Sequence, residues 1–243
     1  IGSPEQVRQA ALVLGAADMC NVYGSTETYG NCCVTPHDLP LEVRANCQGP
    51  PLPGVTVRAV HPQTRRPVPE GEPGELEVYG YVTPGYADNP EENTKAFTPD
   101  GYFRSGDMGW LDERGFVHYF TRANEMIKTG GINVSPLEVE AFLATHPAVL
   151  HVAVVGVPDP VRGEAVWAYV VPRQGHALAP EALIAHCRAH MASYKAPAHI
   201  ELCESLPLTD TGKLARKELK RQANEQASAL AAQQAPSQGT SRK

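Results

Sequence analysis

The sequence lacks the features that mark two large classes of protein. Acidic residues outnumber basic ones by 27 to 21, which gives a formal net charge of −6. No stripe of lysine and arginine is present to neutralise a phosphate backbone, so we expect no nucleic-acid partner. The longest apolar runs, such as VAVV at 152–155, have the length of a strand. They fall far short of the bilayer thickness, so we expect no membrane span.

The cysteines lack the spacing of a disulfide scaffold or of a zinc site. Six are present in 243 residues, and none of the paired motifs of either class occurs among them. Unpaired thiols are typical of a reducing compartment and no signal peptide is visible, so we predict a cytoplasmic location. Because the chain begins with Ile1 and not with methionine, we also expect an upstream portion of the protein to be missing.

Upstream of residue 121 the pattern is typical of β structure. GVTVRAV (54–60) and GELEVYG (74–80) predict strands, and a Pro-rich loop separates them. MGWL and FVHYF flank a turn at residues 112–115 and predict a hairpin. We therefore interpret residues 1–121 as a β-rich region.

Downstream, residues 122–222 have the pattern of a compact α/β domain. Ser135-Pro136-Leu137-Glu138 combines a capping box with proline at the first helical position, which predicts the start of a helix. HVAVVGV (151–157) and AVWAYVV (165–171) are typical of buried strands. Residues 223–243 are rich in Gln, Ala and Ser without periodicity, and we predict that they form a disordered tail.

Four polar clusters lie at predicted turns: NVYGSTETYG (21–30), YFRSGD (102–107), TRANEMIKTGGINVSP (121–136) and PLTDTGK (207–213). In the first cluster, hydroxyls and backbone amides suit a phosphate, and the carboxylate beside them suits magnesium. In the second, a single carboxylate at the end of a strand suits the two hydroxyls of a ribose. Each pattern taken alone is also common in solvated loops.

PLTDTGK ends in Gly-Lys, as a phosphate-binding P-loop does. A P-loop needs glycine at its first position, but Pro207 stands there and has no N–H to donate. Leu214 follows Lys213, where a P-loop carries a magnesium-binding hydroxyl. The P-loop interpretation is therefore excluded. The residues alone leave open a surface turn ahead of a short basic helix, LARKELKRQ.

In this order, YGSTE, YFRSGD, TRANEMIKTGGINVSP and PLTDTGK closely resemble the motifs of the adenylate-forming enzymes. These include acyl-CoA synthetases, firefly luciferase and the adenylation domains of peptide synthetases. The resemblance covers residues 12–222, and PGYADNPEENTKAF (84–97) is similar to acyl-CoA synthetases in particular. It implies an α/β, mixed α+β fold class: the C-terminal part of a large domain with a β-rich subdomain (1–121), then a small mobile C-terminal domain (122–222).

The resemblance also implies a reaction in two steps. A small-molecule carboxylate and ATP give an acyl-adenylate and pyrophosphate, and the acyl group then passes to coenzyme A. The implied nucleotide-binding residues are Asn21, Tyr23, Gly24, Ser25, Thr26, Asp107, Arg122 and Lys213.

Individual roles follow from the motif positions. Tyr23 stacks on the adenine, Thr26 binds the α-phosphate and Glu27 holds Mg²⁺. Asp107 takes the ribose hydroxyls with Arg122 beside it. Lys213 bridges the attacking carboxylate and the phosphate, which makes Lys213, Thr26 and Glu27 the implied catalytic residues.

The third motif carries the implied hinge and the coenzyme A tunnel. Asn124 is the hinge residue by motif position, and Gly130 and Gly131 line the tunnel, where a missing side chain leaves room. Two positions depart from the usual pattern: Thr121 replaces a glycine, and Asn124 replaces an aspartate or lysine.

Full members of the family carry a further phosphate loop and most of the acyl pocket upstream of this region. We therefore interpret the chain as the C-terminal half of an acyl-CoA synthetase, inactive until the missing N-terminal half is supplied. We expect residues 122–222 to fold alone and residues 1–121 not to do so. The alternative is a catalytically inactive remnant that binds a nucleotide or a partner. A peptide-synthetase adenylation domain fits less well, because no carrier domain follows.

Overall fold

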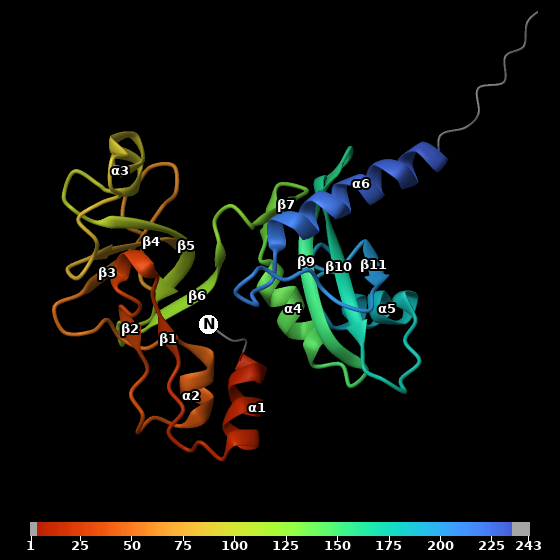
Figure 1. Cartoon of the computed structure of the whole chain (residues 1–243), viewed down its shortest axis with the longest axis horizontal. Coiled ribbons are helices and arrows are strands. Elements are labelled where there is room, and N and C mark those ends of the chain that lie inside the picture. The colour runs from red at the N-terminus through yellow and green to blue at the C-terminus, as the bar shows by residue number, and fades with distance from the viewer. Residues whose placement is uncertain (1–3, 235–243) are drawn as a thin grey trace, which may run out of the picture. The chain divides into compact units, whose positions relative to one another are not determined.

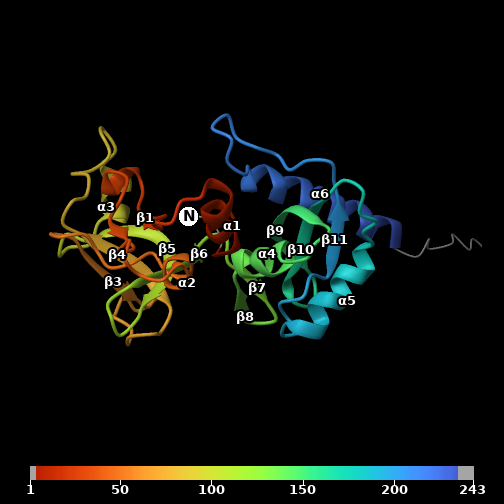
Figure 2. The same cartoon turned by 90° about the horizontal axis from the view of Figure 1, so that it is seen from below.

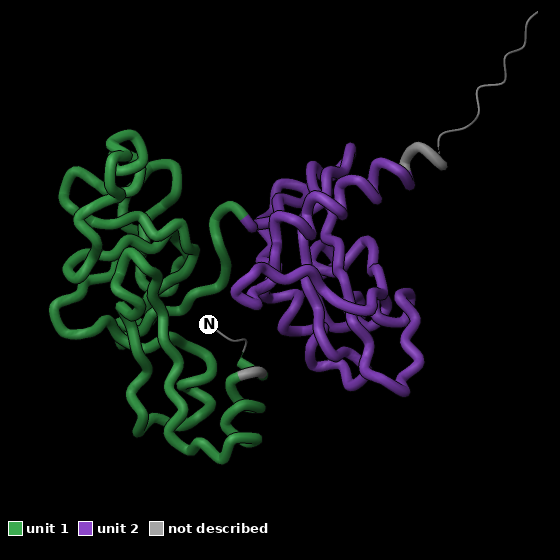
Figure 3. The backbone as a smooth tube through the Cα atoms, in the orientation of Figure 1, with its two compact units in different colours: residues 1–124 green, residues 125–243 purple. Residues whose placement is uncertain are grey.

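The computed structural model describes residues 4–234 (Figure 1). The chain divides into two compact units, residues 1–124 and 125–243 (Figure 3). This boundary lies slightly C-terminal to the one predicted at residue 121. Both units mix helices and sheets, which confirms the predicted fold class.

Unit 1 is built around a four-stranded antiparallel sheet with the strand order β3-β4-β5-β6, and a short ribbon of β1 and β2 lies outside that sheet. Its elements are α1 (Pro4–Leu14), β1 (Val22–Tyr23), the 3-10 helix η1 (Thr26–Thr28), β2 (Cys33–Val34), α2 (Leu41–Asn46), β3 (Thr56–Val60), β4 (Gly74–Tyr79), α3 (Pro90–Ala96), β5 (Phe103–Leu111) and β6 (Val117–Arg122). The strands predicted at 54–60 and 74–80 are confirmed. The main buried cluster of this unit packs Tyr23 and Cys33 against strand residues such as Val57, Leu76 and Val78.

The predicted hairpin is formed by β5 and β6. The side chain of Asp112 closes its turn, because Oδ1 accepts the backbone N–H groups of Arg114 at 3.0 Å and of Phe116 at 2.9 Å. The register shifts by one residue in β6, where Met108 pairs with Thr121 but Gly109 pairs with Tyr119. A bulge of this kind re-aims the side chains beyond it.

Unit 2 is built around a five-stranded sheet in which β10 pairs with β9, β11 and the end of β7. Its elements are β7 (Ile127–Thr129), β8 (Ile132–Val134), α4 (Pro136–Ala144), β9 (Val149–Asp159), β10 (Gly163–Pro172), α5 (Pro180–His190), β11 (His199–Leu202) and α6 (Arg216–Gln234). The predicted helix start is confirmed at α4, where Ser135 is the N-cap residue: its side chain accepts the N–H of Glu138, and Pro136 follows at the first helical position. The two predicted buried strands form β9 and β10.

Alternate side chains of β10 pack against helices on opposite faces of the sheet, which explains why its sequence is one continuous apolar run. Val166, Ala168 and Val170 face the core beneath α4 and α5, whereas Trp167 and Tyr169 face α6. Figures 1 and 2 show α6 on one side of the strands and α4 with α5 on the other. A strand covered on both faces loses the polar positions that a half-exposed strand keeps.

Helix α6 corrects the prediction of a tail. Residues 223–234, assigned above to a disordered segment, are helical, and residues 235–243 lie outside the described residues. Leu219 and Ala223 are fully buried against the sheet, and the Tyr169 hydroxyl donates to Gln226 Oε1 at 2.5 Å. Alanine and glutamine have high intrinsic helix propensity, and this docking supplies the tertiary contacts that composition alone does not reveal.

Across residues 4–234, the structure contains no helix with both the length and the apolar character needed to cross a bilayer.

Candidate active site

Three residues from different motifs meet in unit 1: Tyr23 of the first motif, Asp107 of the second, and Arg122 at the start of the third. The Tyr23 hydroxyl donates to Asp107 Oδ2 at 2.7 Å, across 84 residues of sequence. Arg122 Nε lies 2.9 Å from Asp107 Oδ1, because β5 and β6 pair these two residues directly beyond the bulge. Arg122 also donates to the Ser105 carbonyl oxygen at 3.1 Å. The fold therefore assembles a Tyr–Asp–Arg group from segments that are far apart in the sequence.

This group is closed to solvent on the side of Tyr23 and Asp107. The two residues are 2% and 4% exposed, whereas the Arg122 side chain is 47% exposed. Burial and the neighbouring Asp107 carboxylate raise the pKa of Tyr23 well above its ordinary value, so its hydroxyl stays protonated and donates. The Tyr23 ring packs beside Tyr119, with centroids 6.0 Å apart. Stacking of a base on Tyr23 would therefore require the surrounding loop to open.

The first motif forms a tight turn that its glycine makes possible. A side chain at Gly24 would overlap the carbonyl oxygen of Gly30. Thr28 closes the turn, since its Oγ1 accepts the N–H of Ser25 at 2.8 Å. Asn21 anchors the entry, because its Nδ2 donates to the Cys47 carbonyl oxygen at 3.0 Å. Asn21 and Gly24 thus shape the turn, while the exposed Thr26 is presented at its outer side.

Glu27 lies on this turn as a partly buried carboxylate. The Tyr86 hydroxyl donates to its Oε1 at 2.9 Å. Burial would raise the pKa of Glu27, but hydrogen bonds from its own backbone, from Ser25 and from Tyr86 outweigh burial and lower it. Glu27 is therefore ionised at neutral pH.

The donor set fits magnesium. Mg²⁺ prefers oxygen ligands and is usually held by one or two carboxylates together with phosphate oxygens. An ionised Glu27 beside the exposed hydroxyl of Thr26 offers that chemistry on one turn.

Lys213 lies on an exposed turn of unit 2. The Thr209 N–H donates to the Lys213 carbonyl oxygen at 2.7 Å, and the Lys213 N–H donates to Thr209 Oγ1 at 3.2 Å. Gly212 has a φ of +76°, a conformation that glycine adopts without strain. The turn therefore has a defined backbone shape and an exposed lysine.

An ion pair anchors the chain just after this turn. Both terminal nitrogens of Arg216 donate to the Glu140 carboxylate at 2.8 Å, and one of them also donates to the Val154 carbonyl oxygen at 3.1 Å. Burial raises the pKa of Glu140 and the Arg216 guanidinium opposes that rise. This pair connects the first turn of α6 to α4 and β9. It therefore restricts the position of the nearby Lys213 turn relative to the sheet of unit 2.

The implied hinge and tunnel residues of the third motif lie on two exposed turns. Asn124 directly follows β6. Its φ is not positive; among the described residues other than glycine, only Tyr29, Arg65 and Asp88 have a positive φ. Gly130 and Gly131 connect β7 to β8 with φ values of +58° and +79°. Two positive angles in a two-residue loop are typical of a type I′ hairpin turn. A Cβ added at either glycine would meet no atom of the described residues within 4 Å, so the turn is open.

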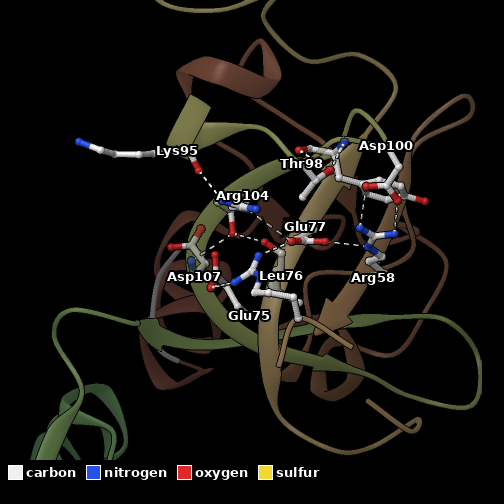
Figure 4. A network of polar contacts seen from close by, with 12 residues as sticks. Arg58, Glu75, Leu76, Glu77, Lys95, Thr98, Asp100, Arg104 and Asp107 are labelled. Carbon is white, nitrogen blue, oxygen red and sulfur yellow. Dashed lines mark hydrogen bonds and ion pairs between the residues drawn. The ribbon is translucent and has the colours of Figure 1, made fainter. Parts of the chain in front are cut away.

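A second polar cluster in unit 1 surrounds Glu77, which is 1% exposed (Figure 4). Strand pairing places Arg58 of β3 and Arg104 of β5 on either side of it. Arg58 Nε donates to Glu77 Oε2 at 2.7 Å, and Arg65 donates to Oε1. Both carboxylate oxygens thus accept hydrogen bonds from arginines. We therefore interpret the cluster as a structural one that neutralises a buried carboxylate and links β3, β4 and β5 through their side chains.

Sequence reasoning missed three residues that hold the site together. Thr28 closes the first turn, Tyr86 contacts Glu27, and Asn93 holds Tyr86. The segment PGYADNPEENTKAF carried a signal through its resemblance to acyl-CoA synthetases, but nothing local shows that Tyr86 reaches a residue 59 positions away.

The chain is similar to known proteins over most of its length. Residues 3–87 match the AMP-binding enzyme family, and residues 138–213 match the AMP-binding enzyme C-terminal domain. The crotonobetaine/carnitine–CoA ligase of Proteus mirabilis (strain HI4320) is 40% identical over 174 residues, which cover 69% of this chain and 33% of that protein.

Two solved structures are similar to the chain. ATP-bound MatB from Rhodopseudomonas palustris superposes with a TM-score of 0.84 at 33% identity, over 90% of this chain and 43% of that chain. The o-succinylbenzoate CoA synthetase MenE of Bacillus subtilis, in complex with its acyl-adenylate intermediate, superposes with a TM-score of 0.80 at 28% identity, over 90% and 44%.

The two matched regions, in this order, define an adenylate-forming enzyme. The chain belongs to the AMP-binding enzyme family, and its relatives include CoA ligases. It spans between 31% and 39% of the length of the curated relatives it matches.

Proposed function

We propose that the chain is the C-terminal part of an ATP-dependent carboxylate–CoA ligase, which forms an acyl-adenylate and then a thioester with coenzyme A. The observation that carries this proposal is the meeting of the YGSTE turn with the YFRSGD strand through the 2.7 Å hydrogen bond from Tyr23 to Asp107. Because the chain spans less than two fifths of its relatives' length, the activity is proposed for a protein that joins this chain to the missing N-terminal half.

In this proposal unit 1 binds the nucleotide. Asp107 accepts the ribose hydroxyls once the exposed Arg122 side chain moves aside, and Tyr23 holds the Asp107 carboxylate in place. Thr26 binds the α-phosphate. Glu27 ligates Mg²⁺, which neutralises phosphate charge when it is bound. Tyr23 is then a positioning residue in this structure, and adenine stacking belongs to an opened form of the loop.

Unit 2 supplies the cation for the first half-reaction. Negative charge accumulates on oxygen as the carboxylate attacks the α-phosphorus, and a positioned ammonium stabilises that charge. Lys213 is exposed on a turn of defined shape, which suits this role. We assign the hinge to Asn124 and the approach of coenzyme A to the open turn at Gly130 and Gly131.

The rival proposal is a remnant that binds a nucleotide without catalysis. It would keep the Tyr23–Asp107 contact but would not need Lys213, so the lysine separates the two. The six cysteines are all free thiols, which fits a reducing compartment, and the cytoplasm stays the proposed location.

The test uses the full-length ligase with Lys213→Ala. Carboxylate-dependent ATP–pyrophosphate exchange should fall by about 10²–10³-fold, the usual loss for one positioned group that stabilises developing charge. Thioester formation from pre-made acyl-adenylate should fall much less. Lys217→Ala removes an exposed lysine from the first turn of α6 and serves as the control. Equal losses in both half-reactions would refute the role of Lys213, and no exchange activity in the unaltered protein would favour the remnant.

A further inference from the structure

Glu27 is held from two sides by one distant segment. The Tyr86 hydroxyl donates to Glu27 Oε1 at 2.9 Å, and the Thr83 N–H donates to the Glu27 carbonyl oxygen at 2.7 Å. Residues 83–86 lie between β4 and α3 and belong to neither the first nor the second motif. Both the backbone and the carboxylate of Glu27 are therefore fixed by residues outside its own turn.

Tyr86 is itself clamped by helix α3. Asn93 Oδ1 accepts the N–H of Tyr86 at 2.7 Å, and Asn93 Nδ2 donates to the Tyr86 carbonyl oxygen at 2.9 Å. This two-point contact needs the glycine before Tyr86, since a side chain at Gly85 would lie 2.9 Å from Asn93 Oδ1. The Asn89 side chain caps α3 by accepting the N–H of Glu92 at 3.2 Å. A capped helix thus carries the residue that fixes the Tyr86 backbone.

We propose that Tyr86, clamped by Asn93, is the positioning residue for metal-bound nucleotide at Glu27. The hydroxyl donates to Oε1 and so fixes the orientation in which the Glu27 carboxylate would hold the metal. This inference rests on the proposed function, because it takes the metal site at Glu27 from there.

The physical reason lies in the freedom of a glutamate side chain. A glutamate on a surface turn samples several rotamers, and binding a metal through it costs the entropy of choosing one. The Tyr86 hydrogen bond selects that rotamer before the metal arrives. Partners that orient a metal-binding carboxylate typically change metal affinity by about 10–100-fold. Glu27 is only partly buried, so we expect the lower end of that range, about tenfold.

A simpler interpretation is that Tyr86 only ties two loops together. The two interpretations differ in whether the effect depends on metal. A positioning residue changes the affinity for metal-bound ATP and leaves the affinity for metal-free ATP unchanged, whereas a loop tie changes both by the same factor.

The experiment measures binding of Mn²⁺·ATP and of metal-free ATP to the full-length ligase, because residues 1–121, which hold Tyr86 and Glu27, are expected to need the N-terminal half. Electron paramagnetic resonance follows Mn²⁺, and calorimetry follows metal-free ATP. Tyr86→Phe removes only the hydroxyl and should weaken Mn²⁺·ATP about tenfold, without changing the affinity for ATP in EDTA. Asn93→Ala should shift the same ratio in the same direction. Tyr81→Phe is the matched control, since it removes the same atom from a 65% exposed tyrosine of the same loop. Thermal melts confirm that each variant is folded.

Each outcome decides the matter. Unchanged Mn²⁺·ATP affinity in Tyr86→Phe overturns the inference, and so does an equal loss with and without metal. If the unaltered full-length ligase binds Mn²⁺·ATP no better than its Glu27→Gln variant does, the metal role of Glu27 fails, and with it this inference. That last pattern identifies a failure of the proposed function, because it appears before Tyr86 is altered.

Discussion

Replacing Asp107 with alanine should reveal how the Tyr–Asp–Arg group is held together. The substitution removes the charged acceptor of the Tyr23 hydroxyl, in a side chain 2% exposed, and leaves the Ser105 side chain beside it. Loss of a buried hydrogen bond to a charged group costs about 1–3 kcal/mol. The lost pair with Arg122 adds about 0–1 kcal/mol, because that side chain is half-exposed. We therefore expect unit 1 to lose about 1–4 kcal/mol of stability.

A double substitution separates the effect on the Tyr23 hydroxyl from other causes. Tyr23→Phe in the Asp107→Ala background removes the hydroxyl that has lost its charged acceptor. The double variant should therefore be more stable than Asp107→Ala alone, by about 1 kcal/mol.

Urea unfolding of the full-length ligase measures both effects in unit 1. Of the two tryptophans in this chain, Trp110 lies on β5 of unit 1 and Trp167 lies on β10 of unit 2. In a background that keeps Trp110 as its single tryptophan, the fluorescence transition reports unit 1. Equal midpoints for the single and double variants would refute the account of the buried hydroxyl. If folded Asp107→Ala binds ATP as tightly as the unaltered protein, the proposed ribose contact is wrong.

Three further predictions concern stability. Burial opposes the low pKa of Asp112, but hydrogen bonds with His118 and Arg114 hold that pKa at about 2, below the ordinary value of 3.8. The contribution of the Asp112 carboxylate to stability is therefore complete above about pH 4 and is lost as the pH falls towards 2. In acid titrations of urea midpoints, the stability difference between Asp112→Asn and the unaltered protein should vanish over that range. Arg216→Ala should destabilise unit 2 by about 3–5 kcal/mol, because it leaves the Glu140 carboxylate buried without its cation; Arg221→Ala, which breaks only exposed pairs, should not measurably change the Trp167 transition. Limited proteolysis should cut first near residues 123–126 and leave a resistant fragment that begins there, whereas uniform resistance across residues 1–121 would contradict the expectation that this region needs a partner.

The features that sequence predicted well are those set by a few neighbouring residues. Ser135 and Pro136 define the start of α4 through one side-chain hydrogen bond and one fixed dihedral angle. The apolar runs of β9 and β10 indicate strands because β-branched residues fit a covered sheet. These signals are local, so they can be read without knowing what lies nearby in the fold.

Other features depend on distant partners and could not be predicted in this way. Alternation in GELEVYG would place Glu77 on a solvent-facing side, yet it is 1% exposed because arginines from β3 and from the following loop neutralise it. The contact from Tyr86 to Glu27 joins residues 59 positions apart. For Tyr23 and Asp107, the resemblance implied a shared nucleotide, but the hydrogen bond between them depends on the fold that brings their strands together.

Helix α6 determines where the protein can be shortened for expression. Composition suggests cutting after Gln222, but that cut removes Ala223 and Gln226 from the sheet face that carries Trp167 and Tyr169. The uncovered face is a strip of large apolar side chains on adjacent strands, a surface that favours self-association. A truncation at residue 222 should therefore yield a protein of low solubility, whereas a chain that ends after residue 234 keeps its own cover and tolerates a C-terminal tag.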